Sequence, residues 1–158
     1  MNKKNYLAKL RTLVAAASLF VLCAMPEAYA RQGLGVGGIV GEPTGLSLKY
    51  WLTDTSAIDA AFGIAFSDNN NSEFHADYLM HSASSRARSA SISWYYGIGG
   101  RIKNDNDTRV GIRAPLGLTY LFADTPIDLF GEIVPVLDLS PKGDLGLNGA
   151  AGLRYYFH

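Results

Sequence analysis

The sequence predicts an all-β fold, an eight-stranded, antiparallel, up-and-down β-barrel, from three observations. Short apolar stretches alternate with clusters of turn residues such as EPTG, DNNNS, KNDNDT and SPKGD, a spacing typical of sandwiches and barrels. Within each stretch the charges keep to alternate positions, and successive side chains of a strand point to opposite faces. Glycine (17) and tyrosine (9) are frequent and recur inside the apolar stretches, which favours strands over helices.

The N-terminal segment, residues 1–30, is expected to be a secretory signal peptide, and residues 31–158 to form one barrel domain. A lysine- and arginine-containing start precedes the apolar run Leu13–Met25, and Ala28-Tyr29-Ala30 is a small-x-small cleavage site. The apolar run is shorter than the ~20 residues of a membrane-spanning helix. The single cysteine, Cys23, lies in this segment after Leu22. A lipoprotein signal has a small residue there, so we expect a mature chain without lipid, thiol or disulfide.

The first strand is expected at Gly33–Gly41, GLGVGGIVG, although this stretch also fits the dinucleotide pattern G-x-G-x-x-G. That pattern has meaning only between a strand and a helix. Here a cleavage site precedes it, and Pro43 and Gly45 stand where the helix would begin. Its outward side chains are expected to be Leu34, Val36 and Val40.

The other strands are separated by short turns, so neighbours should pair antiparallel. They are expected at Leu46–Leu52, Ile58–Phe66, Glu73–His81, Ser91–Arg101, Arg109–Phe122, Ile127–Asp138 and Leu145–Phe157. One connection, SASSRARSA, is longer and carries Arg86 and Arg88. We expect a solvated turn there, with contact to anionic head groups or peptidoglycan as the alternative.

The side of the sheet that faces inward follows from size. An eight-stranded barrel has room only for side chains, and the apolar face carries bulky residues such as Phe62, Trp94 and Tyr120. The charged face is otherwise rich in Gly, Ala and Ser. We therefore expect a transmembrane barrel with a polar, filled lumen and lipid outside. The alternative is a soluble, lipocalin-like binder of apolar ligands, with the apolar face inward.

The charged face predicts an ionic network in the lumen, because buried charges need partners. Its expected members are Lys49, Asp59, Glu73, His75, Asp77, His81, Arg101, Arg109, Arg113, Asp128, Glu132, Asp138 and Arg154. Counted from the turns, the expected pairs are Arg113–Glu132, Arg109–Asp138, Arg154–Asp128, Lys49–Asp59, and Arg101 with Glu73 and Asp77.

Aromatic residues provide an independent indication of a membrane. The apolar face at the end of the barrel that holds the chain termini should carry an aromatic girdle, as membrane barrels do at their interfaces. Its expected members, on the periplasmic side, are Tyr50, Tyr78, Tyr120, Phe122, Tyr155 and Phe157.

Several motifs also resemble a known family. They are FHADYLMH, YYGIGGRI, and GIRAPLGLTYLFADTPIDLFGEIVPVLDL followed by LNGAAGLRYYF. Together they are similar to small, largely uncharacterised bacterial outer-membrane proteins with an OmpA-like eight-stranded barrel. The resemblance implies a Gram-negative outer membrane and insertion by the barrel-assembly machinery, which recognises a final strand ending in an aromatic residue. Here His158 follows Phe157, a departure that concerns the assembly signal.

The sharpest chemical cluster is His75, Asp77 and His81. Imidazoles and carboxylates bind zinc or copper, but on a strand the two histidines lie roughly 20 Å apart, too far to share one ion. We therefore expect lumen filling and no metal or cofactor, although either histidine could still ligate with groups from a neighbouring strand.

The predicted function is structural or surface-interacting, without an open pore, because eight strands leave a filled lumen. The alternative is a membrane-embedded enzyme resembling a lipid A hydrolase. Such an enzyme needs a lipid-facing Ser–His pair, which the predicted faces do not offer. The expected partners are outer-membrane lipid, the assembly machinery and an unknown surface ligand bound by the short loops, with the protein a monomer. A net charge of +0 argues against nucleic acid.

Overall fold

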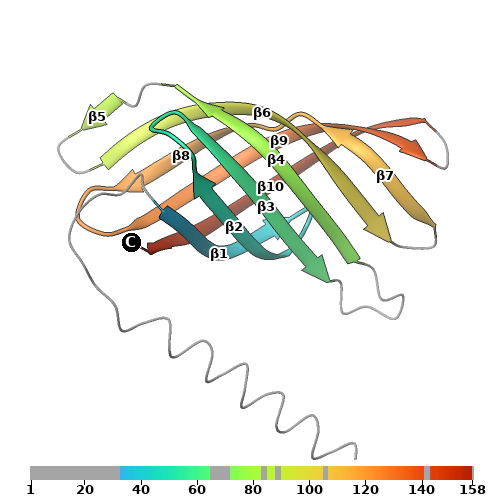
Figure 1. Ribbon diagram of the computed structural model, residues 1–158, viewed down its shortest axis with the longest axis horizontal. Coiled ribbons are helices and arrows are strands. Elements are labelled where there is room, and N and C mark those ends of the chain that lie inside the picture. Colours follow the sequence, from blue (N-terminus) through green and yellow to red (C-terminus); the bar gives the residue numbers. More distant parts are fainter. Residues whose placement is uncertain are drawn as a thin grey trace, which may run out of the picture.

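The computed structural model describes residues 33–64, 72–82, 85–87, 90–104, 107–140 and 143–157, which form one antiparallel sheet closed into a barrel (Figure 1). The expected signal peptide lies outside the described residues. The strands are β1 (Gly33–Gly41), β2 (Gly45–Trp51), β3 (Ser56–Ile64), β4 (Ser72–His81), β5 (Ser85–Ala87), β6 (Ala90–Asn104), β7 (Thr108–Arg113), β8 (Leu116–Phe122), β9 (Ile127–Ser140) and β10 (Asp144–Phe157). No helix among these residues is long and apolar enough to cross a membrane.

The ring has eight positions, in the order β1, β2, β3, β4, β6, β7 with β8, β9, β10. Neighbouring positions are consecutive in sequence, so the barrel is up-and-down. It closes where β1 pairs with β10, from Leu34↔Phe157 to Gly41↔Ala150. The predicted fold class is confirmed.

One predicted strand, Arg109–Phe122, is divided into β7 and β8 by Ala114 and Pro115. Proline has no N–H and cannot donate to a ladder. Both halves nevertheless lie between β6 and β9. The interruption is bridged by hydrogen bonds from Ala114 N to Pro135 O (3.0 Å) and from Gly97 N to Pro115 O (2.9 Å). The ring position therefore continues through the break.

The long connection before β6 contains a short strand that was expected to be a turn. β5 pairs with the start of β6, with Arg86 opposite Ser91. Arg88 lies outside the described residues, so the alternatives for this pair of arginines stay predictions.

Two glycines of β1 show why the first strand is rich in this residue. At Gly37 a Cβ atom would overlap the carbonyl oxygen of Leu153 on β10. Gly41 has a φ of 122°, a backbone conformation that residues with a side chain rarely adopt. These two glycines lie in the stretch that contains the dinucleotide-like pattern, and they allow the close approach of β1 and β10.

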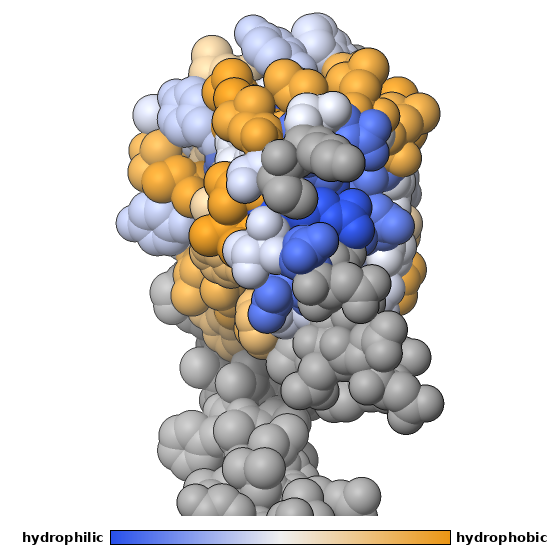
Figure 2. Space-filling model, turned by 90° about the vertical axis from the view of Figure 1, so that its right-hand side faces the viewer, coloured by the Kyte–Doolittle hydropathy of each residue, from blue (hydrophilic) through white to orange (hydrophobic). Residues whose placement is uncertain are grey.

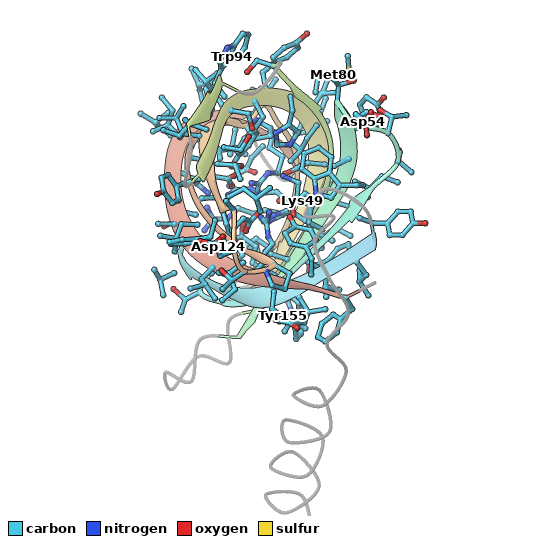
Figure 3. The ribbon with its side chains drawn as sticks, turned by 90° about the vertical axis from the view of Figure 1, so that its left-hand side faces the viewer. Lys49, Asp54, Met80, Trp94, Asp124 and Tyr155 are labelled. Carbon is cyan, nitrogen blue, oxygen red and sulfur yellow. The ribbon has the colours of Figure 1, made fainter. Side chains whose placement is uncertain are left out.

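The two faces of the sheet differ sharply in exposure. Leu118, Trp94 and Tyr96 on the outside are 60%, 51% and 50% exposed, whereas Lys49 and Arg113 on the inside are 1% and 0% exposed. In a view from the end that holds the chain terminus, Lys49 lies inside the ring and Trp94 outside it (Figure 3). The lipocalin-like alternative is wrong, because it requires the apolar face to point inward.

Candidate functional site

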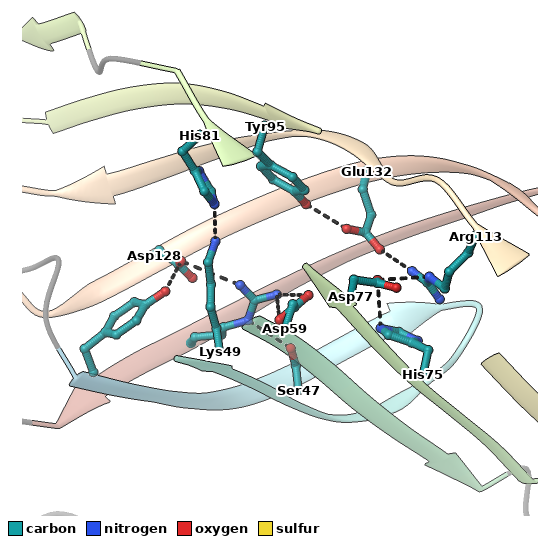
Figure 4. Close-up of polar contacts among 12 residues, drawn as sticks. Ser47, Lys49, Asp59, His75, Asp77, His81, Tyr95, Arg113, Asp128 and Glu132 are labelled. Carbon is teal, nitrogen blue, oxygen red and sulfur yellow. Dashed lines mark hydrogen bonds and ion pairs between the residues drawn. The ribbon is translucent and has the colours of Figure 1, made fainter. Parts of the chain in front are cut away.

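The functional candidate of this barrel is its ion-paired lumen. The structure places the predicted network residues on the inner face, where all except Arg109 are buried and Arg109 is half-buried. A dashed network of contacts crosses the interior between strands that are distant in the ring (Figure 4).

Arg154 of β10 is the centre of one deep group. Its Nη2 lies 3.1 Å from Asp59 Oδ1, on β3, and its Nη1 lies 3.9 Å from Asp128 Oδ2. Its Nε donates to Ser47 Oγ at 2.9 Å, and its guanidinium stacks 3.7 Å from the ring centroid of Phe130. The predicted contact with Asp128 is therefore present, but the shorter one is to Asp59.

Arg113 of β7 is the centre of a second deep group. Its Nη2 donates to Glu132 Oε1 at 3.1 Å, which is the pair expected from counting from the turns, and its Nε lies 3.0 Å from Asp77 Oδ2. Tyr95 donates its hydroxyl to the other oxygen of Glu132 at 2.7 Å. Asp77 was expected to pair with Arg101. It pairs with Arg113 instead, because the side chains of Asp77 and Arg113 both extend into the lumen.

The predicted pair Lys49–Asp59 is wrong. Lys49 stands opposite Asp59 in the register of β2 and β3, yet its ammonium group lies 2.9 Å from His81 Nε2 and 4.7 Å from the ring centroid of Trp51. Asp59 is bound by Arg154 instead. The lysine side chain is long enough to reach past its cross-strand neighbour.

A third ionic group lies toward the opposite mouth, where hydrophilic residues gather beside a hydrophobic rim (Figure 2). Arg101 contacts Asp138 at 2.8 Å and Glu73 at 3.7 Å, and Lys103 also lies 3.7 Å from Glu73. Asp138 was expected to face Arg109. The register of β7 and β9 places Gly111 opposite Asp138, and that carboxylate is bound by Arg101.

The sequence-based network missed two tyrosines. Tyr95 binds Glu132, and Tyr156 donates its hydroxyl to Asp128 at 2.7 Å. Both occupy positions of the charged face in the alternation of β6 and β10, so parity could have found them. Tyr156 also joins an apolar cluster with Trp51, Ala57 and Leu121 that fills the lumen near the chain terminus.

The aromatic residues predicted as a girdle all lie on the outer face, near the strand ends on the side of the C-terminus. Tyr50, Tyr78 and Tyr120 are exposed, and Phe122, Tyr155 and Phe157 are half-buried. Two pairs make edge-on ring contacts, Tyr120–Phe122 at 4.9 Å and Tyr155–Phe157 at 5.0 Å between centroids.

Two further features bear on the chemistry. The histidines that the structure describes, His75 and His81, both lie in the lumen at 0% and 5% exposure, so neither is available to a lipid-facing hydrolase. Ligand atoms of Asp59, His75 and Asp77 lie within 4.8 Å of one another. Among the described residues, Asp59, His75 and Asp77 are the group whose side chains could hold a metal ion.

Comparisons with known proteins support the fold alone. No family model matches the chain, and no curated protein matches its sequence. The structure is similar to the crystal structure of the N-terminal β-barrel domain of Pseudomonas aeruginosa OprF, with a TM-score of 0.56 at 15% identity, covering 78% of this chain and 95% of that one. At this identity the likeness supports the β-barrel fold.

Proposed function

We propose that this protein is a small barrel of the Gram-negative outer membrane, with a sealed lumen and a structural or surface-interacting role. The observation that carries the proposal is the inversion of the two faces. Most large apolar side chains on the outside are 37–77% exposed, while buried carboxylates and cations fill the inside. A protein surrounded by water would hide the first set and expose the second.

Lipid is the solvent that suits this exterior. In a closed sheet the backbone N–H and C=O groups are hydrogen-bonded between neighbouring strands, and no strand edge is exposed to lipid. The aromatic residues near one rim suit the interface between acyl chains and head groups. Residues Leu118 (60%), Ile133 (55%) and Ile98 (63%) would face the acyl chains.

A sealed lumen is supported by contacts across the interior. Arg154 joins β10 to β3, and Arg113 joins β7 to β4, each through fully buried ion pairs. Trp51, Leu121 and Tyr156 fill the end near the chain terminus. We therefore infer that solutes do not diffuse through the barrel.

The route to the membrane follows from the chain ends. The segment 1–30 would direct export and be removed, and the aromatic end of β10, Tyr155 to Phe157, would serve as the signal for the barrel-assembly machinery. Short polar connections at the other rim would present the surface that contacts a ligand or partner. We propose a monomer without enzymatic activity, since both described histidines lie inside.

The first experiment is fractionation combined with heat-modifiability. The full chain is expressed in a Gram-negative host, and gel migration in detergent is compared with and without boiling. We expect a boiling-dependent shift found only in the outer-membrane fraction. A variant lacking residues 1–30 should stay in the cytoplasm and show no shift. Recovery of the full chain as a soluble periplasmic protein would overturn the proposal.

The sealed lumen has a separate test. Purified protein is reconstituted in a planar bilayer, with a trimeric porin as the positive control. We expect no stepwise conductance from the wild-type protein while the porin conducts. Stable open steps from the wild-type barrel would contradict the filled interior but leave the membrane location intact.

A further inference from the structure

We propose that Asp59, His75 and Asp77 form a binding site for one divalent metal ion, of which Zn²⁺ is the best fit, inside the barrel. This departs from the sequence-based expectation of no metal. The cluster expected from the sequence was His75, Asp77 and His81. In the structure, Asp59 of the adjacent strand lies beside His75 and Asp77 in place of His81.

The strand register creates the cluster. Asp59 on β3 lies directly opposite Asp77 on β4, and His75 lies opposite Ala61. Residues two apart on a strand share a face, so His75 and Asp77 both point inward. Ala61, opposite His75, has a small side chain, and Figure 4 shows the imidazole of His75 next to the carboxylate of Asp77. Each residue offers one ligand atom, and these atoms lie within 4.8 Å of one another.

The imidazole of His75 is the second, independent observation. Its side chain is fully buried, and neither ring nitrogen makes a hydrogen bond; the nearest charged atom, Asp77 Oδ2, is 3.8 Å from Nε2. Asp77 Oδ1 also lacks a hydrogen bond, whereas Asp59 Oδ1 lies 3.1 Å from Arg154 Nη2 and Asp77 Oδ2 lies 3.0 Å from Arg113 Nε. Burying a polar group without a partner costs about 1–3 kcal/mol. A metal ion that accepts an electron pair from a ring nitrogen of His75 would remove part of this cost.

Charge favours a cation at this point. Asp59 and Asp77 face each other across the strand pair, an arrangement that destabilises a sheet. The deep lumen contains the buried carboxylates of Asp59, Asp77, Asp128 and Glu132 against the cations Lys49, Arg113 and Arg154, an excess of one negative charge with neutral histidines. Arg113 and Arg154 contact Asp77 and Asp59, but each also contacts a second carboxylate, Glu132 at 3.1 Å and Asp128 at 3.9 Å.

The donor set indicates which ion. Two carboxylate oxygens and one imidazole nitrogen suit Zn²⁺, which is held by such groups at about 2.0–2.2 Å. Tetrahedral geometry at these lengths needs ligand atoms roughly 3.4 Å apart, so the side chains would close around the ion. Arg113 and Arg154 contact the carboxylates at 3.0 and 3.1 Å. They would orient the carboxylates as outer-shell partners do.

The binding test uses the mature barrel refolded in detergent after EDTA treatment. The protein is incubated with Zn²⁺, passed through a desalting column and analysed for bound zinc; Co²⁺ is used in parallel as a visible-light probe. We expect one Zn²⁺ per chain, a Co²⁺ absorption spectrum typical of low coordination number, and a higher unfolding temperature with Zn²⁺ than with EDTA.

Matched variants locate the site. His75→Gln should lower Zn²⁺ affinity by at least about tenfold, since even loss of an outer-shell partner costs roughly 10–100-fold. His81→Gln removes the other inward histidine of β4 and should bind Zn²⁺ as the wild type does. Folding of each variant is verified by its heat-modifiable migration. A wild-type barrel that retains no Zn²⁺ or Co²⁺ overturns the proposal, as does equal binding by the two variants. Neither result affects the proposed membrane location.

Discussion

The lumen holds its ion pairs in two settings, a deep one around Arg113 and Arg154 and a shallower one around Arg101 at the mouth. Side chains of the deep pairs are 0–2% exposed, whereas those of the mouth are 5–7% exposed for Arg101, Asp138 and Glu73 and 22% for Lys103. Buried ions have little solvent to replace a lost partner, while water screens exposed ones. The same residue types should therefore contribute very differently along one interior.

The largest effect is expected for Arg113→Ala. Its removal leaves Asp77 without its ion-pair partner and Glu132 with only the hydroxyl of Tyr95. Breaking a buried pair by deleting one partner costs about 3–5 kcal/mol. Urea-induced unfolding of the refolded barrel in detergent would measure the loss. A change below about 1 kcal/mol would mean that water reaches the deep group.

A smaller effect is expected for Tyr95→Phe, which tests the same group through one hydrogen bond. The variant loses the 2.7 Å bond to Glu132 while Arg113 still binds that carboxylate. A hydrogen bond to a charged group contributes about 1.5–3 kcal/mol, so we expect a loss near the lower end. Unfolding should be compared with Tyr96→Phe, whose side chain lies on the outer face at 50% exposure, and which should change stability little.

At the mouth, Arg101→Ala should cost about 1–2 kcal/mol, because Asp138 and Glu73 lose a partner but can be reached by water. Arg101 makes three hydrogen bonds to Asp138, at 2.8–3.1 Å. The measurement is the unfolding free energy at low and high salt. A loss equal to that of Arg113→Ala would show that the two settings do not differ.

The smallest effect is expected for Lys103→Ala. Its ammonium lies 3.7 Å from Glu73 and is the most exposed partner of the network, at 22%. Exposed pairs contribute about 0–1 kcal/mol and are screened by salt. The difference from wild type should vanish in 1 M NaCl. A salt-independent loss would place Lys103 in the deep class.

How far the sequence predicted this interior depends on whether a contact runs along the sheet or across it. Alternation assigned the faces of the eight predicted strands correctly where the structure describes them, and turn counting predicted Arg113–Glu132 because these residues lie on adjacent ring positions. It missed Arg154–Asp59 and Arg113–Asp77, which join non-adjacent strands. Such contacts depend on barrel curvature and side-chain length, which no local pattern encodes.

The register shift near Gly111 and the break at Pro115 were missed for a related reason. One uninterrupted strand from Arg109 to Phe122 would show the same alternation of faces. A proline or a bulge changes which residues pair across the strands, but here it does not change the face on which each side chain lies. The register of β7 and β9 places Gly111, and not Arg109, opposite Asp138. The aspartate–histidine cluster likewise needed the register of β3 and β4, which brings in Asp59.

Two strands of this barrel, β2 and β9, differ in length by a factor of two, with 7 and 14 residues. At about 3.3 Å per residue and a tilt near 45°, they would span roughly 16 Å and 33 Å, against an apolar band of about 25 Å. In a bilayer, acyl chains beside β2 would shorten while those beside β9 would not. Such mismatch costs fractions of a kcal/mol per Å. The barrel would then thin the membrane on one side only. Its two sides would therefore differ for the lipids and proteins around it in the plane of the membrane.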